Sequence, residues 1–281
     1  MKPKDWTPRN RLEARYRIEI DRLITKYLSI PEDATLGQIN AILVQFAQAS
    51  RFLESSATQI SVRMATQIKV ENAKSWMEAA RKGSRGREIY SAIQREMRTG
   101  VGRTVHEIVI ENAKLIRSLP AKISENVSRE TSEMQQKGLR AEEIAQYLRR
   151  RIPRLTKSHA ALIARTETSK SATALTRARS EDLGIGWYEW ATSEDARVRV
   201  SHRKMDMVLV SWEDPPSPER LVGEKSEGLY HAGNIYNCRC DSYPVLRPEM
   251  LSWPHRVYRH GRIAYMTLAQ FRKIYQSAIA A

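Results

Sequence analysis

Apolar residues in the first half of the chain recur at the three- and four-residue spacing of amphipathic helices. A start signal at Thr7-Pro8 precedes such a pattern over residues 12–27, which Pro31 is expected to end. Thr35 can cap a longer helical stretch toward Met77, with a break expected near residues 55–56. A turn at 83–86 and further helices near 87–98, 103–118, 121–136 and 141–151 are predicted, separated by glycine or proline signals.

The pattern changes after Ser158. A helix is predicted from there to Leu183, with Gly184 as its left-handed cap. Strands are predicted at 186–192, 208–212 and 241–246, and Thr267 can cap a last helix after a tail with little pattern. The helix is rich in small residues that would let the sheet approach it closely: Ala160, Ala161, Ala164, Ser169, Ser171, Ala172, Ala174 and Ala178.

The predicted fold class is therefore α+β, with an elongated, mostly helical N-terminal region followed by a small antiparallel β-sheet domain packed on a long helix. Three parts are predicted along the chain. Residues 1–155 form a basic helical region, 156–247 an α+β domain, and 248–281 a C-terminal extension with a short helix.

Positive charge is unevenly distributed. The formal net charge is +15, and residues 1–155 hold 29 Lys and Arg against 18 Asp and Glu, whereas 156–281 hold 18 against 14. A basic helical region attracts polyanions, so double-stranded DNA is a candidate partner. Basic and acidic residues are interleaved and no known nucleic-acid module is recognisable, so such contact is expected to be independent of sequence. A solvated, soluble surface is the alternative.

No membrane segment or signal peptide is expected, because no apolar run is long enough for either. Synthesis and folding in the cytosol are the expectation.

Both cysteines of the chain lie in one C-x-C element, Cys238 and Cys240. On an extended backbone their side chains point to the same side, so both thiolates could reach one metal. Zinc suits sulfur and imidazole ligands without redox chemistry, and His202, His231 and Asp195 are the candidates that could complete its coordination. A small, strained disulfide and a pair of reduced cysteines without a ligand role are the alternatives.

Charged residues near these candidates suggest structural ties. Asp195 can pin a turn by accepting backbone N–H groups, and Arg197 and Arg199 are expected on one face of an extended segment, pairing with carboxylates, DNA or a partner. Arg165 and Glu167 lie two apart on a helix, so each needs a partner elsewhere.

The sequence favours a binding protein over an enzyme. It contains no recognisable Ser-His-Asp arrangement, phosphate-binding glycine loop or zinc deaminase signature. A zinc-bound water would need a nearby base, for which Glu194 or Asp206 are the only suggestions.

Four ordered elements carry a family resemblance. They are Ile163-Ala164-Arg165-Thr166-Glu167-Thr168, a strand ending at Trp190, Asp195-x-Arg197-x-Arg199-x-x-His202, and Asn237-Cys238-Arg239-Cys240. Over roughly residues 138–244 the chain resembles the phage head morphogenesis family, the Mu F-like minor head proteins. It departs from that pattern at Met207, where a glycine is usual, and at residues 231–234, which replace Pro-Gly-Asp.

The resemblance implies a minor head protein of a tailed phage, a non-enzymatic virion component inside the capsid near the portal vertex, made in the host cytoplasm. Its implied partners are the portal protein and possible scaffold or major capsid proteins, and its implied role is in head assembly and genome packaging or delivery. The motif residues carried over are Arg165, Thr166, Glu167, Arg197, Arg199 and Asn237. A metal-dependent enzyme or toxin acting on nucleic acid, and a free basic DNA-binding protein, are the alternatives.

Overall fold

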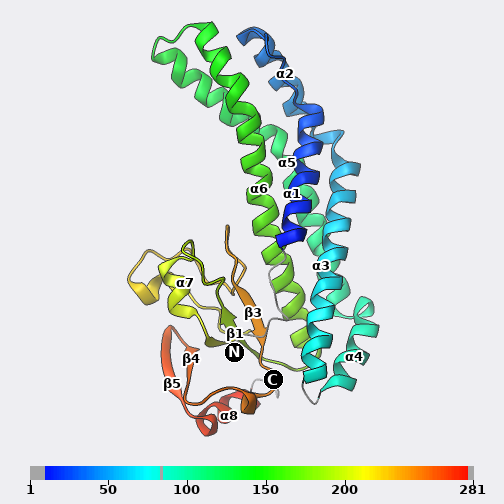
Figure 1. Ribbon diagram of the computed structural model, residues 1–281, viewed down its shortest axis with the longest axis vertical. Helices are drawn as coiled ribbons and strands as arrows, with labels where there is room; N and C mark the ends of the chain where they lie inside the picture. The colour runs from blue at the N-terminus through cyan, green and yellow to red at the C-terminus, as the bar shows by residue number, and fades with distance from the viewer. Residues whose placement is uncertain (1–9, 83–84, 278–281) are drawn as a thin grey trace. The chain divides into compact units, whose positions relative to one another are not determined.

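The computed structural model describes residues 10–82 and 85–277 (Figure 1). The start signal at Thr7-Pro8 lies outside these residues, as do two positions of the turn predicted at 83–86. The helices are α1 (Asn10–Tyr27), α2 (Leu36–Gln48), α3 (Glu54–Lys82), α4 (Gly86–Arg95), α5 (Gly100–Gln136), α6 (Ala141–Asp182), α7 (Val200–Met205) and α8 (Leu268–Ser277). The strands are β1 (Trp187–Ala191), β2 (Val208–Ser211), β3 (Asp241–Pro244), β4 (His255–Arg259) and β5 (Arg262–Met266). The predicted α+β class is confirmed.

The chain forms two compact units from interleaved stretches of sequence. The helical unit comprises residues 10–65 and 107–164, and the mixed unit contains residues 66–106 and 165–277. Helices α3, α5 and α6 each contribute residues to both units. The boundaries predicted above at 155 and 247 follow motifs rather than compactness and remain predictions.

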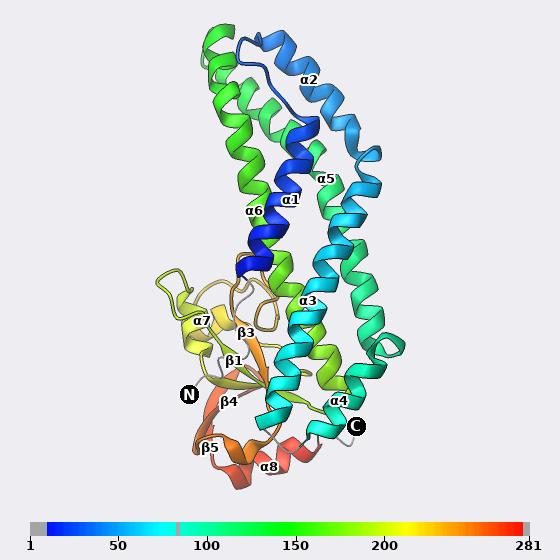
Figure 2. The same cartoon turned by 45° about the vertical axis from the view of Figure 1, so that its right-hand side comes forward.

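Two helices are longer than predicted because prolines do not end them. Pro120 lies inside α5 and Pro153 inside α6, and both helices are continuous in Figure 2. A proline inside a helix removes one backbone hydrogen bond and costs about 3 kcal/mol. The residues that flank these prolines are buried and oppose that cost, namely Ile116, Leu119, Ile123, Ile152 and Leu155. Core packing therefore outweighs the local signal.

Several helix ends agree with the sequence. Thr35 forms a capping box with Gln38 at the start of α2. Thr267 and Gln270 make the same reciprocal contacts at α8. Gly138 and Gly184 have positive φ after α5 and α6, as expected of C-caps. The break in the second helical stretch lies at residues 49–53, slightly before the predicted position.

The sheet of the mixed unit has five strands in the order β3-β1-β2-β4-β5. Strands β2 and β4 are parallel and the other pairs antiparallel, so the expectation of a small, purely antiparallel sheet was wrong. The hairpin of β4 and β5 was missed because β5 is largely exposed and carries no clear alternation.

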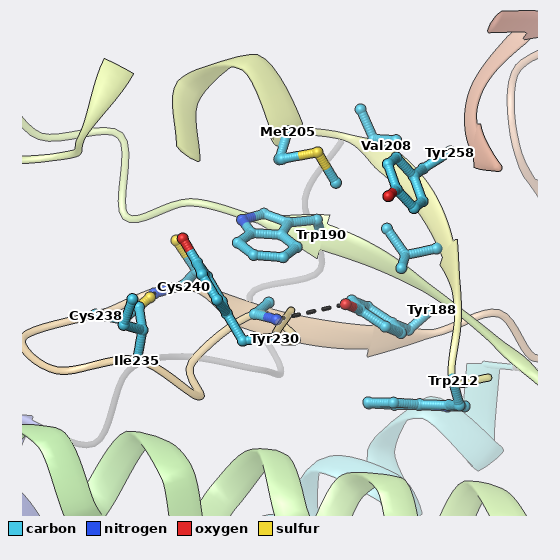
Figure 3. Packing of buried hydrophobic residues seen from close by; sticks show 12 residues of the cluster. Tyr188, Trp190, Met205, Val208, Trp212, Tyr230, Ile235, Cys238, Cys240 and Tyr258 are labelled. Atoms are coloured by element: carbon cyan, nitrogen blue, oxygen red, sulfur yellow. Dashed lines mark hydrogen bonds between the residues drawn. The ribbon is translucent and has the colours of Figure 1, made fainter. Parts of the chain in front are cut away.

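Both faces of the sheet are covered. Trp187, Leu209 and Val257 pack with Phe271 of α8 on one face. Tyr188, Trp190, Val208, Val210 and Tyr258 form a cluster on the other face, together with both cysteines (Figure 3). The cysteines are therefore part of the sheet's core.

A buried ionic network joins α3, α6 and the turn before α5 within the mixed unit. The guanidinium of Arg179 donates to Glu96 Oε2 from Nη2 at 2.7 Å and from Nε at 2.9 Å. It also donates to Asn72 Oδ1 and, at 3.3 Å, to the Lys69 carbonyl. Arg179, Glu96 and Asn72 are all buried. A buried pair of this kind adds little net stability when intact, but it is costly to break.

Arg179→Met is expected to lower the free energy of unfolding by about 3–5 kcal/mol, because it leaves the Glu96 carboxylate buried without its main cation. Adding Glu96→Leu should recover much of that loss. Denaturant unfolding of the whole chain measures both, with Arg177→Met, an exposed residue paired with Glu181, as the control. Additive losses in the double variant would contradict the coupling.

Candidate metal centre

Three side chains that the sequence singled out converge in the mixed unit. His202 Nδ1 lies 3.6 Å from Cys238 Sγ and 3.4 Å from Cys240 Sγ. All three residues are buried, and their ligand atoms lie within 4.8 Å of one another. Within residues 10–82 and 85–277, no other group of three or more His, Cys, Asp or Glu side chains meets this spacing.

His202 reaches the cysteines from a helix that the sequence analysis missed. The segment after Asp195 was expected to be extended, but residues 195–198 form a turn and α7 begins at Val200. Asp195 Oδ1 accepts the backbone N–H of Arg197 at 2.9 Å, in agreement with its predicted turn-pinning role. Six residues are too few for helical periodicity to be recognised. Ser201, His202 and Met205 of this helix are buried.

A chain of hydrogen bonds through Tyr230 places a proton on Nε2 of His202, the nitrogen that faces away from the sulfurs. The Tyr230 hydroxyl donates its proton to Glu219 Oε1 and lies 3.1 Å from His202 Nε2. Because the hydroxyl has only one proton, it must accept the N–H of Nε2. In the neutral ring, Nδ1 then carries a lone pair directed at the two sulfurs. Burial and the Glu219 carboxylate raise the pKa of Tyr230 well above its usual value, so it stays protonated.

Both cysteines are free thiols, so the structure contains no disulfide between them. The hydrogen bond from the Cys240 thiol lowers the pKa of Cys238 well below its usual value despite burial, and the protonated form of His202 lowers it further. The same hydrogen bond and burial raise the pKa of Cys240. Cys238 is therefore the more readily ionised of the two.

Asp195 lies outside the group and forms an ion pair with Arg239. Arg239 Nη2 donates to Asp195 Oδ1 at 2.7 Å, and Nη1 donates to the other oxygen. This pairing lowers the pKa of Asp195 to about 2. Arg197 is more distant, at 3.9 Å from the carboxylate. Arg199 instead donates to the Tyr236 carbonyl at 2.9 Å and stacks on the Tyr236 ring.

His231, another candidate ligand, also lies outside the group. Its Nδ1 is 3.1 Å from the Tyr188 hydroxyl, and its ring packs edge-on against Trp212 at 5.1 Å between centroids. Burial, with a smaller contribution from Arg177, lowers the pKa of His231 to about 4. The structure thus makes it a neutral core histidine at neutral pH.

The segment Tyr230–Cys240, here called the 230–240 loop, is held on helix α6. Thr173 Oγ1 donates to the Ala232 carbonyl at 2.7 Å. Gly233 has φ +85°, and a Cβ there would lie 2.4 Å from Thr173 Oγ1, so glycine suits both the backbone and the close approach. The loop therefore packs closely on the helix that was predicted to be rich in small residues.

The family-motif residues of α6 hold the same loop near the cysteines. The backbone N–H of Asn237 donates to Thr166 Oγ1 at 3.1 Å, and Arg165 Nη1 donates to Asn237 Oδ1 at 3.3 Å. Asn237 has φ +54°, a conformation that asparagine tolerates better than most residues. Glu167 pairs with Lys170 at 3.4 Å. Sequence reasoning missed Tyr230 and Glu219, since neither belongs to a recognisable motif.

The depressed pKa of His231 has a consequence for stability. Unfolded histidine takes up a proton near pH 6.5, whereas folded His231 does so only near pH 4. The unfolded chain thus binds the extra proton between these values, so the free energy of unfolding should fall by about 3 kcal/mol as pH drops from 6.5 to 4. His231→Gln should remove this part of the pH dependence, as followed by urea unfolding. The exposed His260→Gln is the control, and an unchanged slope in His231→Gln would contradict the assignment.

Comparison with known proteins agrees with the motif order. Residues 125–243 match the family model described as phage Mu protein F like protein, a span that includes His202, Asn237, Cys238 and Cys240. An uncharacterized protein of Haemophilus influenzae Rd is 31% identical over 142 residues, which is 50% of this chain and 29% of that protein. The chain thus spans less than a third of that relative's length.

No solved structure matches the chain. Among the described residues, no helix combines the length and apolar character needed to cross a membrane. The matched span includes all four ordered motifs noted in the sequence, from Ile163 to Cys240. Residues 125–243 belong to the phage Mu protein F-like family, and the resemblance drawn from the sequence is confirmed.

Proposed function

We propose that the chain is a minor head protein of a tailed phage, a virion component that acts by binding rather than by turnover. The observation that carries this proposal is the family match over residues 125–243, which includes the whole 230–240 loop and its contacts on α6. In this proposal the protein lies inside the capsid near the portal vertex and acts in head assembly and in genome packaging or delivery. It is made in the host cytoplasm.

The portal protein is the proposed main partner, with scaffold or major capsid protein as further partners. Exposed apolar side chains on the helical unit support a docking role: Phe52 is 73% exposed and Val44 61% exposed. Apolar groups at a surface mark a site that another protein covers where they form a contiguous patch, and the variants below test this for Phe52 and Val44. The helical unit is therefore the proposed portal-binding part.

Double-stranded DNA is the second proposed partner, bound without sequence specificity. Residues 10–65 and 107–164 hold 18 Lys and Arg against 13 Asp and Glu, a surplus of 5. Two thirds of the net charge of +15 therefore lies in the rest of the chain. Contact with DNA is accordingly proposed for the whole chain rather than for its first 155 residues, a cut that would also fall inside α6.

A metal-dependent hydrolase acting on nucleic acid is the second candidate function. The observation that favours it is the three-residue group of His202, Cys238 and Cys240, because catalytic zinc sites keep three protein ligands and one open position. Nucleic-acid turnover that is lost in His202→Ala would support this candidate. Absence of turnover in metal-loaded protein would leave the binding role.

The protein should be present in purified phage heads and should bind an isolated portal oligomer. Phe52→Asp together with Val44→Asp should weaken portal binding at least tenfold, because charge is introduced into the proposed apolar contact. Tyr265→Asp is the matched control, since this residue is 71% exposed but lies in the mixed unit. Heads that lack the protein would refute the assignment, and equal binding by all variants would refute the proposed surface.

The whole chain should bind duplexes of unrelated sequence with equal affinity. That affinity should fall by at least tenfold between about 50 and 200 mM salt, since each phosphate contact releases counterions. Fluorescence anisotropy with two unrelated duplexes measures this. Binding that does not respond to salt, or no binding at low salt, would contradict this proposal. The positive charge would then serve to keep the protein soluble.

A further inference from the structure

We propose that His202 Nδ1, Cys238 Sγ and Cys240 Sγ bind one zinc ion, with a non-protein donor such as water in the fourth position. The inference goes beyond the binding role proposed above. It narrows the five candidate ligands of the sequence to three and assigns the atom that each would use. It rests on the spacing of these atoms, on the hydrogen bonds behind them and on the way the 230–240 loop is held.

The spacing of the three atoms fits tetrahedral coordination. With Zn–S of about 2.3 Å and Zn–N of about 2.0 Å, a nitrogen and a sulfur ligand lie about 3.5 Å apart and two sulfurs about 3.8 Å apart. The two Nδ1–Sγ distances are 3.6 and 3.4 Å, and the sulfurs lie within 4.8 Å of each other. One ion can therefore contact all three atoms without a rearrangement of the backbone.

The hydrogen bonds behind His202 are those expected of a zinc ligand. Metal-binding histidines commonly donate their second ring N–H to an oxygen, which fixes the tautomer and strengthens the ligand. Here Nε2 donates to the Tyr230 hydroxyl, and the hydroxyl donates to Glu219. His202, Tyr230 and Glu219 are all buried. In the neutral ring, the form that binds a metal, the lone pair of Nδ1 is thus directed at the sulfurs.

The two sulfurs are also held in advance. Asn237, directly before Cys238, is tied to Thr166 and Arg165 on α6. Cys240 directly precedes β3, which pairs with β1. A ligand set whose supporting residues are already packed loses little conformational entropy on binding.

Asp195 and His231 have other partners, which explains why they do not join the set. Asp195 is engaged by Arg239, and His231 by Tyr188 and Trp212. The fourth position is therefore assigned to a non-protein donor. A zinc ion would join α7, which lies between β1 and β2, to the segment before β3, positions 36 and 38 residues apart along the chain. Its role would be to fasten this part of the mixed unit.

The rival explanation is a metal-free trio in which thiols hydrogen-bond to His202. Elemental analysis of the full chain, purified without chelator, distinguishes the two. We expect close to one zinc per chain in the wild type and in His231→Gln, and less than about 0.2 in Cys240→Ser and His202→Gln. His231→Gln is the matched control, because it replaces a buried histidine of the same sheet core that is not among the proposed ligands.

Two further measurements do not depend on the ligand variants folding. Cobalt(II) added to wild-type protein should give the intense visible bands of tetrahedral coordination together with sulfur-to-cobalt charge transfer. Tyr230→Phe should keep one zinc per chain but bind it 10- to 100-fold more weakly in competition with a chromophoric chelator, because the relay behind His202 is lost. Wild-type protein without zinc, with no cobalt spectrum and with melting unchanged by chelator, would overturn the proposal.

Discussion

The attachment of the 230–240 loop to helix α6 is the constraint on which the arrangement of the mixed unit depends. Thr173 holds the carbonyl of Ala232, and Thr166 holds the backbone of Asn237. These contacts require short side chains on the helix and a loop that can come close to it, which explains Ser169 and Thr173 on α6 and the glycine at position 233. With the loop fixed, both cysteines point into the aromatic core of the sheet, where they meet His202. The motif residues on α6 and those in the 230–240 loop, which are far apart in the sequence, thus contact one another and attach the loop to the helix.

Sequence reasoning succeeded where the signal is local. The caps at Thr35 and Thr267, and the glycines after α5 and α6, depend on a few neighbouring residues and were predicted correctly. It failed where tertiary packing decides the outcome, as at Pro120 and in the parallel pairing of β2 with β4. The candidate site shows the same division. Residue type and the C-x-C spacing identified His202 and the cysteines as candidates. The relay through Tyr230 could not be predicted, because it depends on side chains brought together only by the fold.

The reactive side chains described above belong to the mixed unit. The mixed unit keeps its reactive groups inside: the thiols, His231 and the ion pair of Arg179 with Glu96 are all buried. Both units also expose large apolar side chains, such as Phe52 and Val44 in the helical unit and Tyr265 and Leu229 in the mixed unit. Buried reactive groups together with exposed apolar groups are compatible with the binding role proposed above.

The segment that matches the family does not follow the division of the chain into two compact units. The segment that matches the Mu F-like family begins within α5 and ends within β3. Yet Arg179 inside it depends on Glu96 and Asn72, which precede it, and Ile185 packs against Trp76 and Ile89, which also precede it. The matched segment therefore coincides with neither compact unit, and part of its packing comes from residues that precede it. Another chain that carries this segment would need helices outside it that pack against α6. The matched segment therefore constrains the sequence around it.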